Sequence, residues 1–392
     1  MTLNTQTFHS RLEGGEAKKR AILEDLRASI VRGELPPGAQ LPTRRELMVR
    51  YSVSLETVQR ALDQLTHDEF VSATRRRGTF VVDRPPHLSR YALVFRHHPE
   101  RDAHLWTRFY SALWKEAGRL GRTGDCSFET FLGVSEGQPS LTLLEREIEA
   151  QRLAGVIFAD GIYGMEQTSI IRRDDVPRVS VGRVEASNCV AFELDEQELL
   201  RRAIGFFAGR GRKQLAVVSH YHPDWTRHMG IEAMAAAEGM ELLPFHVVTC
   251  VLEQTGAASA LTKLLWNGRV RPDALLVTDD NLVEPVTSAL EEMGVRVGEE
   301  LDVVGHANFP YPTKARVPTR RLGYDVTAML GCALDSINAR RAGQPFEPSH
   351  RFHAVWEDEL RPIPAAPAPR IGGAGLAVFP GAAFGGLAPT AR

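Results

Sequence analysis

The sequence predicts an α/β protein in which a small N-terminal domain precedes two lobes of parallel β-sheet. Residues 17–82 show three helical patterns and then the pattern of a short hairpin. From Tyr91 to residue 361, short apolar runs alternate with amphipathic helical stretches, which is typical of doubly wound parallel sheets. About 270 residues of such alternation suit two lobes better than one.

The composition limits what kind of protein this can be. The chain has 392 residues, of which 43% are hydrophobic and 24% are charged, as in ordinary globular proteins. It has no apolar run of the roughly 20 residues that a membrane helix needs. Residues 1–15 lack the apolar core of an export signal. We therefore expect a cytoplasmic protein with no membrane partner.

Charge is unevenly distributed along the chain. The net charge is −2, but residues 1–82 hold 13 Lys and Arg against 10 Asp and Glu, which leaves −5 for the rest. This mild asymmetry fits a small DNA-facing domain in front of a larger sensor. The four cysteines are too scattered for a disulfide framework or a zinc site, and we expect small buried side chains at Cys126, Cys189, Cys250 and Cys332.

The N-terminal domain is expected to begin after a flexible segment, residues 1–16. The first helix carries an apolar stripe at four-residue spacing, and Gly33 can end it. Residues 36–38, Pro-Pro-Gly, then enforce a turn. The apolar stripe consists of Ile22, Leu26 and Ile30.

Two further helices have clear start signals. Thr43 and Glu46 form the pattern of a capping box, in which each side chain accepts a hydrogen bond from the backbone of the other residue. Ser54 can cap the third helix. The inner face of that helix is apolar and is expected to lie in the core, not on DNA; it consists of Val58, Ala61, Leu62 and Leu65.

A hairpin is expected over residues 70–82, with the basic run Arg75-Arg76-Arg77 at its tip. Gly78 can adopt the positive φ angle that such a turn favours. Residues 83–90 contain two prolines and are expected to form a linker.

Residues 91–361 are expected to form two doubly wound lobes, and the Pro-, Ala- and Gly-rich residues 362–392 a disordered tail. Helical stretches are expected at 105–119, 199–207 and 282–293, among others. Strands are expected at 92–95, 128–132, 155–159, 178–181, 190–192, 215–219, 246–249, 274–277 and 303–305.

A helix pair followed by a basic hairpin makes a winged helix-turn-helix, which has a physical use on DNA. The second helix of the pair fits the major groove of B-DNA, which is about 12 Å wide. The hairpin tip reaches phosphates or the minor groove, and helix N-termini offer free amides to phosphate. The candidate DNA-binding residues are Thr43, Arg44, Arg45, Ser54, Leu55, Glu56, Thr57, Gln59, Arg60, Arg75, Arg76, Arg77 and Gly78.

These residues also have purely structural interpretations. A basic run such as 75–77 is more often a solvated charge cluster, but its position after a helix pair favours DNA binding. Thr43 and Ser54 can act as helix caps alone. A cap and a phosphate contact are compatible, because one helix N-terminus can serve both.

The N-terminal domain resembles the GntR family of transcriptional regulators. The resemblance covers about 65 residues, with matching spacing throughout. It implies that Arg45 contacts phosphate or base and that Ser54 and Thr57 contact the DNA backbone. The matching positions are Ile30, Gly33, Pro37-Gly38, Leu41-Pro42, Arg45-Glu46-Leu47, Tyr51, Val53-Ser54, Thr57-Val58, Ala61-Leu62, Leu65 and Gly78-Thr79-Phe80-Val81.

The sequence departs from that family at the positions that read DNA. Leu55 and Gln59 stand where the family commonly has arginine. Leucine can contact a thymine methyl but cannot pair with guanine, while Glu56 could accept from cytosine and Gln59 could pair with adenine. We therefore expect an operator unlike the usual one of the family.

Residues 91–358 resemble the sensor of lactose-repressor-type regulators, which share the fold of periplasmic sugar-binding proteins. The strings that carry the likeness are 154–160, 176–183, 209–219, 271–280 and 301–305. In such folds the ligand lies between the lobes, at the carboxyl ends of parallel strands. The resemblance thus implies a small-molecule effector, expected to be a sugar or a sugar derivative.

The candidate effector-binding residues are polar or aromatic and lie at predicted strand ends or on adjacent helices. Trp106 and Phe109 could stack on a sugar ring, although Trp106 could equally belong to the core. Asp279 and Asp280 could bind ligand or cap the following helix. The full set is His97, His98, Trp106, Phe109, Asp160, Arg183, Tyr221, Arg227, Asp279, Asp280, His306 and Asn308.

The sensor also departs from its resemblance. Gly182 and Ala307 stand where aspartates commonly hold a sugar. The basic side chains in the candidate set, among them Arg183 and Arg227, leave room for a more acidic or unusual ligand. Arg227 resembles the family position that binds ligand hydroxyls, but it could instead form an ion pair.

The main alternative is a GntR-type domain fused to an aminotransferase-like enzyme that uses pyridoxal phosphate. Such an enzyme needs a Schiff-base lysine, and no lysine beyond residue 82 has a recognisable cofactor context. The sequence also has no phosphate loop, metal motif or nucleophile elbow. We therefore expect a regulator without enzyme activity, cofactor or metal.

The expected mechanism follows from the two domains. Two sensor domains would pair in a homodimer and hold the DNA-binding domains at half-sites about 34 Å apart, or at a multiple of that spacing. The effector must bind the DNA-competent and DNA-incompetent states with different affinity. The sequence does not give the direction of regulation, and a repressor is the default.

Overall fold

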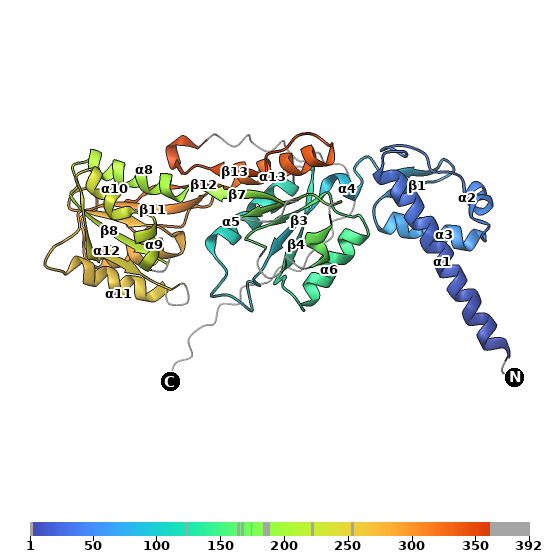
Figure 1. Ribbon diagram of the computed structural model, residues 1–392, viewed down its shortest axis with the longest axis horizontal. Helices are drawn as coiled ribbons and strands as arrows, with labels where there is room; N and C mark the ends of the chain where they lie inside the picture. Colours follow the sequence, from blue (N-terminus) through green and yellow to red (C-terminus); the bar gives the residue numbers. More distant parts are fainter. Residues whose placement is uncertain are drawn as a thin grey trace. The chain divides into compact units, whose positions relative to one another are not determined.

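The structure, a computed structural model, describes residues 3–122, 124–162, 165, 168–173, 175–182, 189–220, 223–251 and 255–360, without the side chains of residues 3–14, 223, 224, 226 and 255. The expected tail, residues 362–392, lies outside the described residues. Figure 1 shows a helical N-terminal domain and two separate β-sheets with helices against their faces.

The N-terminal domain begins with a helix that is longer than expected. Helix α1 (Leu3–Val31) extends into the segment predicted to be flexible. Its apolar stripe is buried, as the spacing predicts, and packs with α2 (Arg44–Tyr51) and α3 (Leu55–His67) in one core. This core also contains Leu47, Val58, Leu62 and Leu65, which confirms their expected structural role.

Both predicted helix caps are present. The Thr43 hydroxyl accepts a hydrogen bond from the Glu46 amide, and the Glu46 carboxylate accepts one from the Thr43 amide at 2.7 Å. The Ser54 hydroxyl accepts one from the Thr57 amide. Each such cap stabilises a helix by about 1 kcal/mol. The caps therefore fix where α2 and α3 begin.

Strands β1 (Val71–Thr74) and β2 (Gly78–Val81) form the predicted antiparallel hairpin. Its tip contains two residues with positive φ, Arg76 at 65° and Gly78 at 120°. The side-chain amide of Gln40 donates to the carbonyl of Arg77 at 3.0 Å. This bond ties the wing to the segment that precedes α2.

The expected linker contains a short helix, α4 (Pro86–Ser89). Its side chain His87 is 8% exposed and stacks on Phe70 of the N-terminal domain. Burial lowers the pKa of His87 to about 4, and the charge of Arg341 adds to the effect. The segment 83–90 is therefore partly ordered and packed.

The first sheet has six parallel strands in the order β13-β7-β6-β5-β3-β4. The helices of this part are α5 (Arg108–Gly121), α6 (Pro139–Glu149), α7 (Ser169–Arg172) and α13 (Val326–Arg341). The strands are β3 (Arg90–Phe95), β4 (Ser127–Leu132), β5 (Gly155–Phe158), β6 (Arg178–Val181), β7 (Cys189–Leu194) and β13 (Ser349–Phe352).

The second sheet has the order β14-β12-β11-β10-β8-β9, in which β14 alone is antiparallel to its neighbour. Its strands are β8 (Gln214–Ser219), β9 (Glu241–Thr249), β10 (Ala274–Val277), β11 (Asp302–Phe309), β12 (Arg320–Asp325) and β14 (Val355–Trp356). Its helices are α8 (Glu196–Gly209), α9 (Pro223–His228), α10 (Ile231–Ala237), α11 (Thr255–Trp266) and α12 (Asp280–Glu292); a 3-10 turn, Glu357–Glu359, follows β14.

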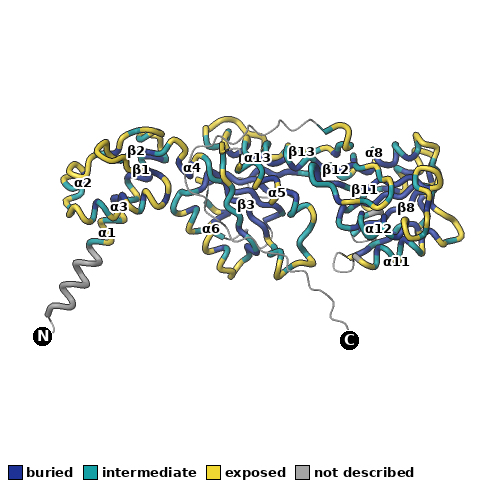
Figure 2. The backbone as a smooth tube through the Cα atoms, turned by 180° about the vertical axis from the view of Figure 1, so that it is seen from behind, coloured by how far each residue is buried: buried dark blue, intermediate teal, exposed yellow. Residues whose placement is uncertain are grey.

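Both sheets are buried on both faces, as a doubly wound fold requires. In β5, Ile157 packs on the face that also holds α5 and α13, whereas its neighbours Val156 and Phe158 pack on the face of α6 and α7. The second sheet has α11 and α12 on one face and α8 and α10 on the other. Figure 2 shows the strands buried and the surrounding helices and loops partly exposed. The predicted fold class is confirmed.

The chain passes between the sheets at three places: from β7 to α8, from β12 to α13 and from β13 to β14. All nine strands expected from apolar runs are present, although several are longer. The expectation missed β12, β13 and β14, because their sequences are short or begin with polar residues such as Arg320 and Arg321. In the part of the chain that the structure describes, no helix is long and apolar enough to cross a membrane.

We predict that Gly323→Ala destabilises the second lobe by about 1–3 kcal/mol, because overpacked sites cost about that much. A Cβ at Gly323 would overlap the backbone carbonyl of Ala307 on the neighbouring strand, which cannot move without breaking the sheet. Urea unfolding of the purified variant measures the change. Gly331→Ala on α13 is the control, because a Cβ there meets nothing within 4 Å and alanine favours helix. Equal stability of the two variants would contradict the packing argument.

Candidate functional site

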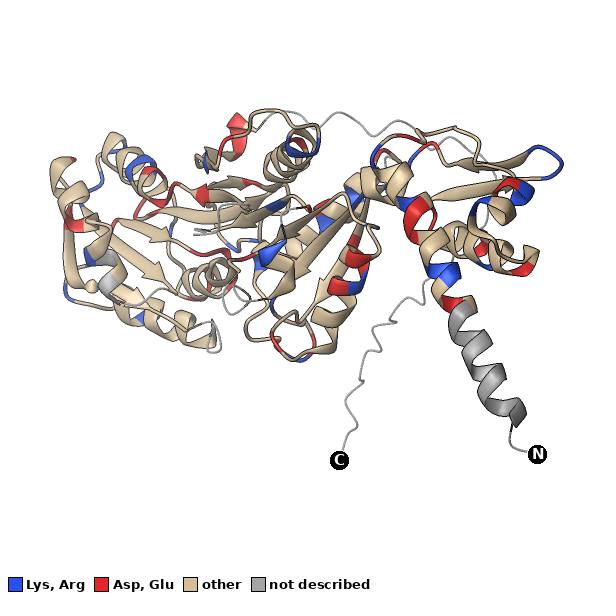
Figure 3. Cartoon of the chain, turned by 45° about the vertical axis from the view of Figure 1, so that its right-hand side comes forward, with Lys and Arg blue, Asp and Glu red and all other residues tan. Residues whose placement is uncertain are grey.

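The N-terminal domain presents the predicted DNA-binding residues on its surface. Thr57 and Gln59 are half-buried, and all other members of the set are exposed. In Figure 3 the ribbon is coloured for Lys or Arg at the turn between β1 and β2 and at places on the helical part of the domain. The structure therefore keeps the predicted set accessible.

The first turn of α2 carries Arg44 and Arg45, both exposed, directly after the Thr43 cap. The hydrogen bond from the Thr43 backbone lowers the pKa of the Glu46 carboxyl, so that the capping charge is present at neutral pH. Free amides at a helix N-terminus and adjacent guanidinium groups form a phosphate-binding arrangement. The arrangement supports the predicted role of Arg45.

The first turn of α3 presents a surface that is not basic. Leu55 is 53% exposed, an unusual exposure for leucine in a small domain. The Gln59 side chain donates to Asp63 at 2.7 Å, which leaves its carbonyl oxygen for other contacts. Arg60 forms a surface ion pair with Glu16 of α1 at 3.2 Å. Such a pair is worth at most about 1 kcal/mol, so DNA phosphate can replace Glu16.

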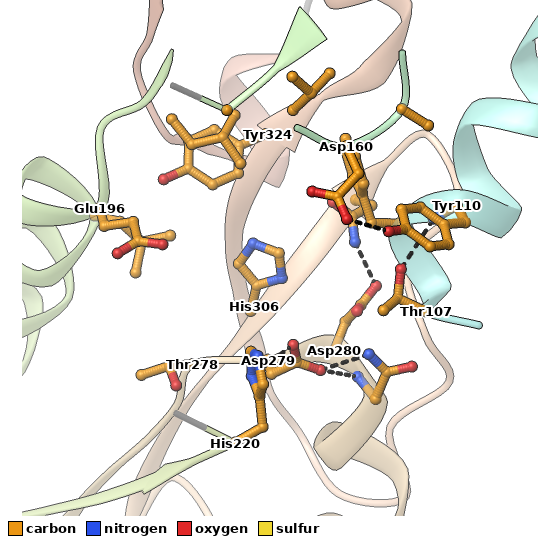
Figure 4. A pocket seen from close by; sticks show the side chains of 18 of the residues that line it. Thr107, Tyr110, Asp160, Glu196, His220, Thr278, Asp279, Asp280, His306 and Tyr324 are labelled. Carbon is orange, nitrogen blue, oxygen red and sulfur yellow. Dashed lines mark hydrogen bonds and ion pairs between the residues drawn. The ribbon is translucent and has the colours of Figure 1, made fainter. Parts of the chain in front are cut away.

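The second candidate site is a cavity of about 560 Å³ at the carboxyl ends of the parallel strands of both sheets (Figure 4). This volume lies within the range of about 300–1,000 Å³ that is typical of small-molecule sites. The lining residues are Thr107, Phe109, Tyr110, Ala159, Asp160, Val181, Gly182, Glu193, Leu194, Glu196, Leu199, Leu200, His220, Trp225, Thr278, Asp279, Asp280, Asn281, His306, Asn308 and Tyr324.

Six of the twelve predicted effector residues line this cavity, four described ones do not, and two lie outside the described residues. Phe109, Asp160, Asp279, Asp280, His306 and Asn308 are in the lining. Arg183 and Tyr221 lie outside the described residues. His97, His98, Trp106 and Arg227 are described but are not part of the lining.

The four side chains outside the lining have other places in the structure. The indole of Trp106 packs against Phe95 and Tyr110 and donates to Ser111 at 3.0 Å. This environment matches the alternative in which Trp106 belongs to the core. His97 stacks on Tyr110 behind the cavity wall. Of the two others, His98 lies in the loop after β3, and Arg227 is exposed on α9.

The wall formed by the first sheet centres on Asp160, at the end of β5. Its carboxylate accepts hydrogen bonds from the Tyr110 hydroxyl at 2.8 Å and from the Gly161 amide at 2.7 Å. Thr107 caps α5 and so positions Tyr110, which is three residues further on. Burial and the adjacent charge of Asp160 raise the pKa of Tyr110, so its hydroxyl stays protonated and donates. Figure 4 shows Tyr110 and Asp160 facing each other across this wall.

The wall formed by the second sheet holds two adjacent aspartates in different environments. Asp279 caps α12 through the Asn281 amide and lies 2.9 Å from the His220 ring. Burial raises the pKa of Asp279, but the hydrogen bond and charge of His220 outweigh burial and lower the pKa overall. The capping alternative for Asp279 is therefore confirmed, although the residue also lines the cavity.

Asp280 is 2% exposed and accepts a hydrogen bond from the Asn308 side-chain amide at 2.7 Å. Burial and the neighbouring charge of Asp279 raise the pKa of Asp280 to about 7. Burial also lowers the pKa of His306 to about 4, so its ring is neutral at physiological pH. The pKa values of Asp280 and His306 lie far from their ordinary ranges because burial disfavours the charged form of each group.

Sequence reasoning missed several polar lining residues. His220 directly follows β8 and precedes the selected Tyr221, and Tyr110 follows the selected Phe109, so each of these missed residues is next to one that was selected. Tyr324 was missed because its strand, β12, was not predicted. The other missed polar residues are Thr107, Glu193, Glu196, Trp225, Thr278 and Asn281.

Gly182 and Ala307, the two positions at which the sequence departs from the sensor family, differ in their relation to the cavity. Gly182 lines the cavity with a φ of 102°, a backbone conformation that side chains rarely adopt. Ala307 is fully buried and is absent from the lining, whereas its neighbours His306 and Asn308 are present. On β11 the polar side chains of the lining are therefore those of the two neighbours of the alanine.

The described residues place few potential metal ligands close together. Within the described ranges, one group of side chains has the spacing of a metal site, namely Asp195, Glu198 and His353, and it lies outside the lining. The described lining contains no lysine that could form a Schiff base. The four cysteines are free.

Comparison with known proteins identifies both parts of the chain. Residues 18–81 match the bacterial regulatory proteins of the gntR family, and residues 204–349 match the periplasmic binding protein-like domain. An arabinose metabolism transcriptional repressor of Halalkalibacterium halodurans is 22% identical over 74% of this chain and 80% of its own length.

Two further proteins are similar to single parts of the chain. The Escherichia coli mannosyl-D-glycerate transport/metabolism system repressor MngR is 39% identical over 64 residues, 16% of this chain and 27% of its own. A solved LacI family transcriptional regulator of Arthrobacter sp. FB24, in complex with lactose, aligns with a TM-score of 0.53 and 15% identity, over 68% of this chain and 97% of that one. The structural likeness shows a shared fold.

We predict that Asp280→Asn stabilises the protein increasingly as the pH rises from about 4 to about 7, after which the gain levels off. The folded state holds the proton of Asp280 up to about pH 7, whereas the unfolded carboxyl has the ordinary value of 3.8, so ionisation favours unfolding across this window. Urea unfolding of variant and wild type at several pH values measures the difference.

Asp279→Asn is the matched control with the opposite sign. The lowered pKa of Asp279 stabilises the folded state at neutral pH and is lost as the pH falls, so this variant is less stable than wild type near pH 7. A constant stability difference for Asp280→Asn over the whole range would show that its carboxyl is not raised.

Proposed function

We propose that this chain, which joins a gntR-type DNA-binding domain to a periplasmic binding protein-like domain, is a transcriptional regulator controlled by a small molecule. The N-terminal domain binds operator DNA, and a sugar or sugar derivative in the cavity changes its affinity. One observation carries this proposal: an accessible winged helix-turn-helix surface and a polar cavity at the strand ends occur on one chain.

The DNA-binding roles follow from the exposed surface of the N-terminal domain. Arg44 and Arg45 at the start of α2, with the amides of that turn, bind phosphate. The first turn of α3 enters the major groove, and Arg75–Arg77 of the wing contact phosphate or the minor groove. The relatives that match this domain carry the names of repressors, which favours repression.

The regulator acts as a homodimer in the cytoplasm, where its operator is. A two-fold dimer matches a palindromic operator whose half-sites are about 34 Å apart or a multiple of that. The effector shifts DNA binding because it binds two states of the dimer with different affinity. The proposal includes no enzyme activity, and the fold of residues 204–349 gives no support to the aminotransferase alternative.

We predict that Arg45→Ala weakens operator binding and lowers the slope of log affinity against log salt by about 1, because one phosphate contact releases about one counterion. Fluorescence anisotropy with labelled operator at several salt concentrations measures both quantities. Arg296→Ala is the control: this exposed arginine of the sensor pairs with Glu299 and Glu300. An unchanged slope for Arg45→Ala would remove Arg45 from the DNA-binding surface.

We predict that selection from random DNA returns an operator that differs from the usual gntR-family consensus. The exposed Leu55 favours thymine through its methyl group, and Glu56 and Gln59 favour cytosine and adenine. Leu55→Arg should shift the selected sequence toward guanine at one position of each half-site. Recovery of the ordinary family operator by wild type would refute this assignment of the reading positions.

A further inference from the structure

The cavity wall on the second sheet holds three buried polar atoms that have no hydrogen-bond partner among the described residues. They are Nδ1 of His306, Oδ1 of Asn308 and the hydroxyl oxygen of Tyr324. Asn308 and Tyr324 are each 2% exposed, and all three residues line the cavity. A buried polar atom without a partner costs about 1–3 kcal/mol. A ligand in the cavity would recover this free energy.

Strand register explains why the three atoms lie together. Asn308 of β11 stands opposite Tyr324 of β12, so their side chains leave the sheet on the same face. His306 is two residues before Asn308 and shares that face, with its ring 5.7 Å from the Tyr324 ring. In Figure 4, His306 lies between Tyr324 and the Asp279–His220 pair.

The chemistry of the missing partners can be derived from the atoms that are already bonded. The Asn308 amide nitrogen donates to Asp280, so its free oxygen can only accept a hydrogen bond from a ligand. The hydroxyl of Tyr324 can donate or accept, and the neutral ring of His306 offers one nitrogen. Several neighbouring hydroxyl or amino groups of one ligand would satisfy this set.

Among the described residues of the cavity lining, the charged side chains are acidic apart from the histidines. The described lining residues include five acidic side chains, Asp160, Glu193, Glu196, Asp279 and Asp280, of which Asp280 keeps its proton up to about pH 7, and no lysine or arginine. Glu193 pairs with Arg351 at 3.5 Å, and Asp279 with His220. These carboxylates would repel an anionic ligand, and a neutral ligand that fills the cavity would take them out of water without compensating their charge.

The carboxylates are spread around the cavity and do not meet at one point. Among the described residues, the one group with the spacing of a metal site lies outside the lining. An organic cation fits this spread better than a metal ion does. Phe109, Tyr110, Trp225 and Tyr324 add aromatic rings, which attract ammonium groups through their faces.

We propose, resting on the proposed function, that the effector is an amino-substituted polyol such as an amino sugar, whose ammonium group is held by the cavity carboxylates and whose hydroxyl groups bond to His306, Asn308 and Tyr324. This ligand class is the opposite of the acidic one that Arg183, Arg227 and the histidines suggested in the sequence. The difference arises because Arg227, His97 and His98 are not part of the described lining.

Three probes that share one carbon core test this proposal. Tris carries an ammonium group on three hydroxymethyl arms, pentaerythritol replaces the ammonium by a fourth hydroxymethyl, and tris(hydroxymethyl)acetate carries a carboxylate there. We expect titration calorimetry of the full chain, in phosphate buffer near neutral pH, to show Tris binding at least about tenfold tighter than pentaerythritol, a difference of about 1.4 kcal/mol. The carboxylate should bind most weakly.

Two variants separate charge recognition from hydroxyl recognition. Asp160→Asn should weaken Tris and leave pentaerythritol nearly unchanged, whereas Tyr324→Phe should weaken both to a similar degree. Glu299→Gln is the control, because it removes an exposed carboxylate that is not part of the described lining. It should change the affinity for neither Tris nor pentaerythritol. Equal affinity for Tris and pentaerythritol, a preference for the carboxylate, or no measurable binding of Tris would overturn the proposal.

The outcome is distinguishable from failure of the proposed function. If the Tris preference is absent but a neutral sugar still changes operator affinity, the ligand class is wrong and the regulator stands. If the full chain binds no DNA, the proposed function as a regulator is wrong, even when the cavity prefers Tris.

Discussion

Parallel strand direction is the constraint on which both lobes depend. A parallel sheet brings the carboxyl ends of its strands to one edge, so residues far apart in the sequence meet there. Asp160, His220, Asp279 and Asn308 come from four strand ends or the turns that follow them, and all four line one cavity. Because the strands are buried on both faces, the polar side chains of this region concentrate at that edge.

The buried aspartates show how the same constraint creates an unusual electrostatic environment. Asp279 and Asp280 are consecutive, yet Asp279 is stabilised in its charged form by His220 and the Asn281 amide, whereas Asp280 has one amide donor from Asn308. Burial and the charge of Asp279 together favour the protonated form of Asp280, and the hydrogen bond from Asn308 does not outweigh them. The protonation state of Asp280 can therefore change when a charged group enters the cavity.

Most of the fold could be predicted from sequence, because it depends on local signals. The caps at Thr43 and Ser54 and the apolar runs of nine strands are patterns of neighbouring residues. The cavity lining was predicted only in part. A wall residue such as Tyr324 is recruited by long-range strand pairing, which no local pattern records. Trp106 shows the reverse case, since an aromatic residue at a promising position packs into the core instead.

In the N-terminal domain, the residues that form the core differ from the exposed residues that we propose to contact DNA bases. Its core residues set the geometry of a gntR-type domain, and the exposed Leu55 and Glu56 do not affect that core. Operator choice can therefore change without loss of the fold. On the sensor side, Ala307 does not line the cavity among the described residues, whereas its neighbours His306 and Asn308 do.

The most direct test of this account is the operator affinity of the full chain with the cavity empty and filled. The filling molecule should be one whose heat of binding is lost in Asp279→Asn, so that its place in the cavity is established. The account predicts that this molecule changes operator affinity in wild type and leaves the affinity of the variant unchanged. A molecule that fills the cavity without any change in operator affinity would contradict the coupling of the two domains.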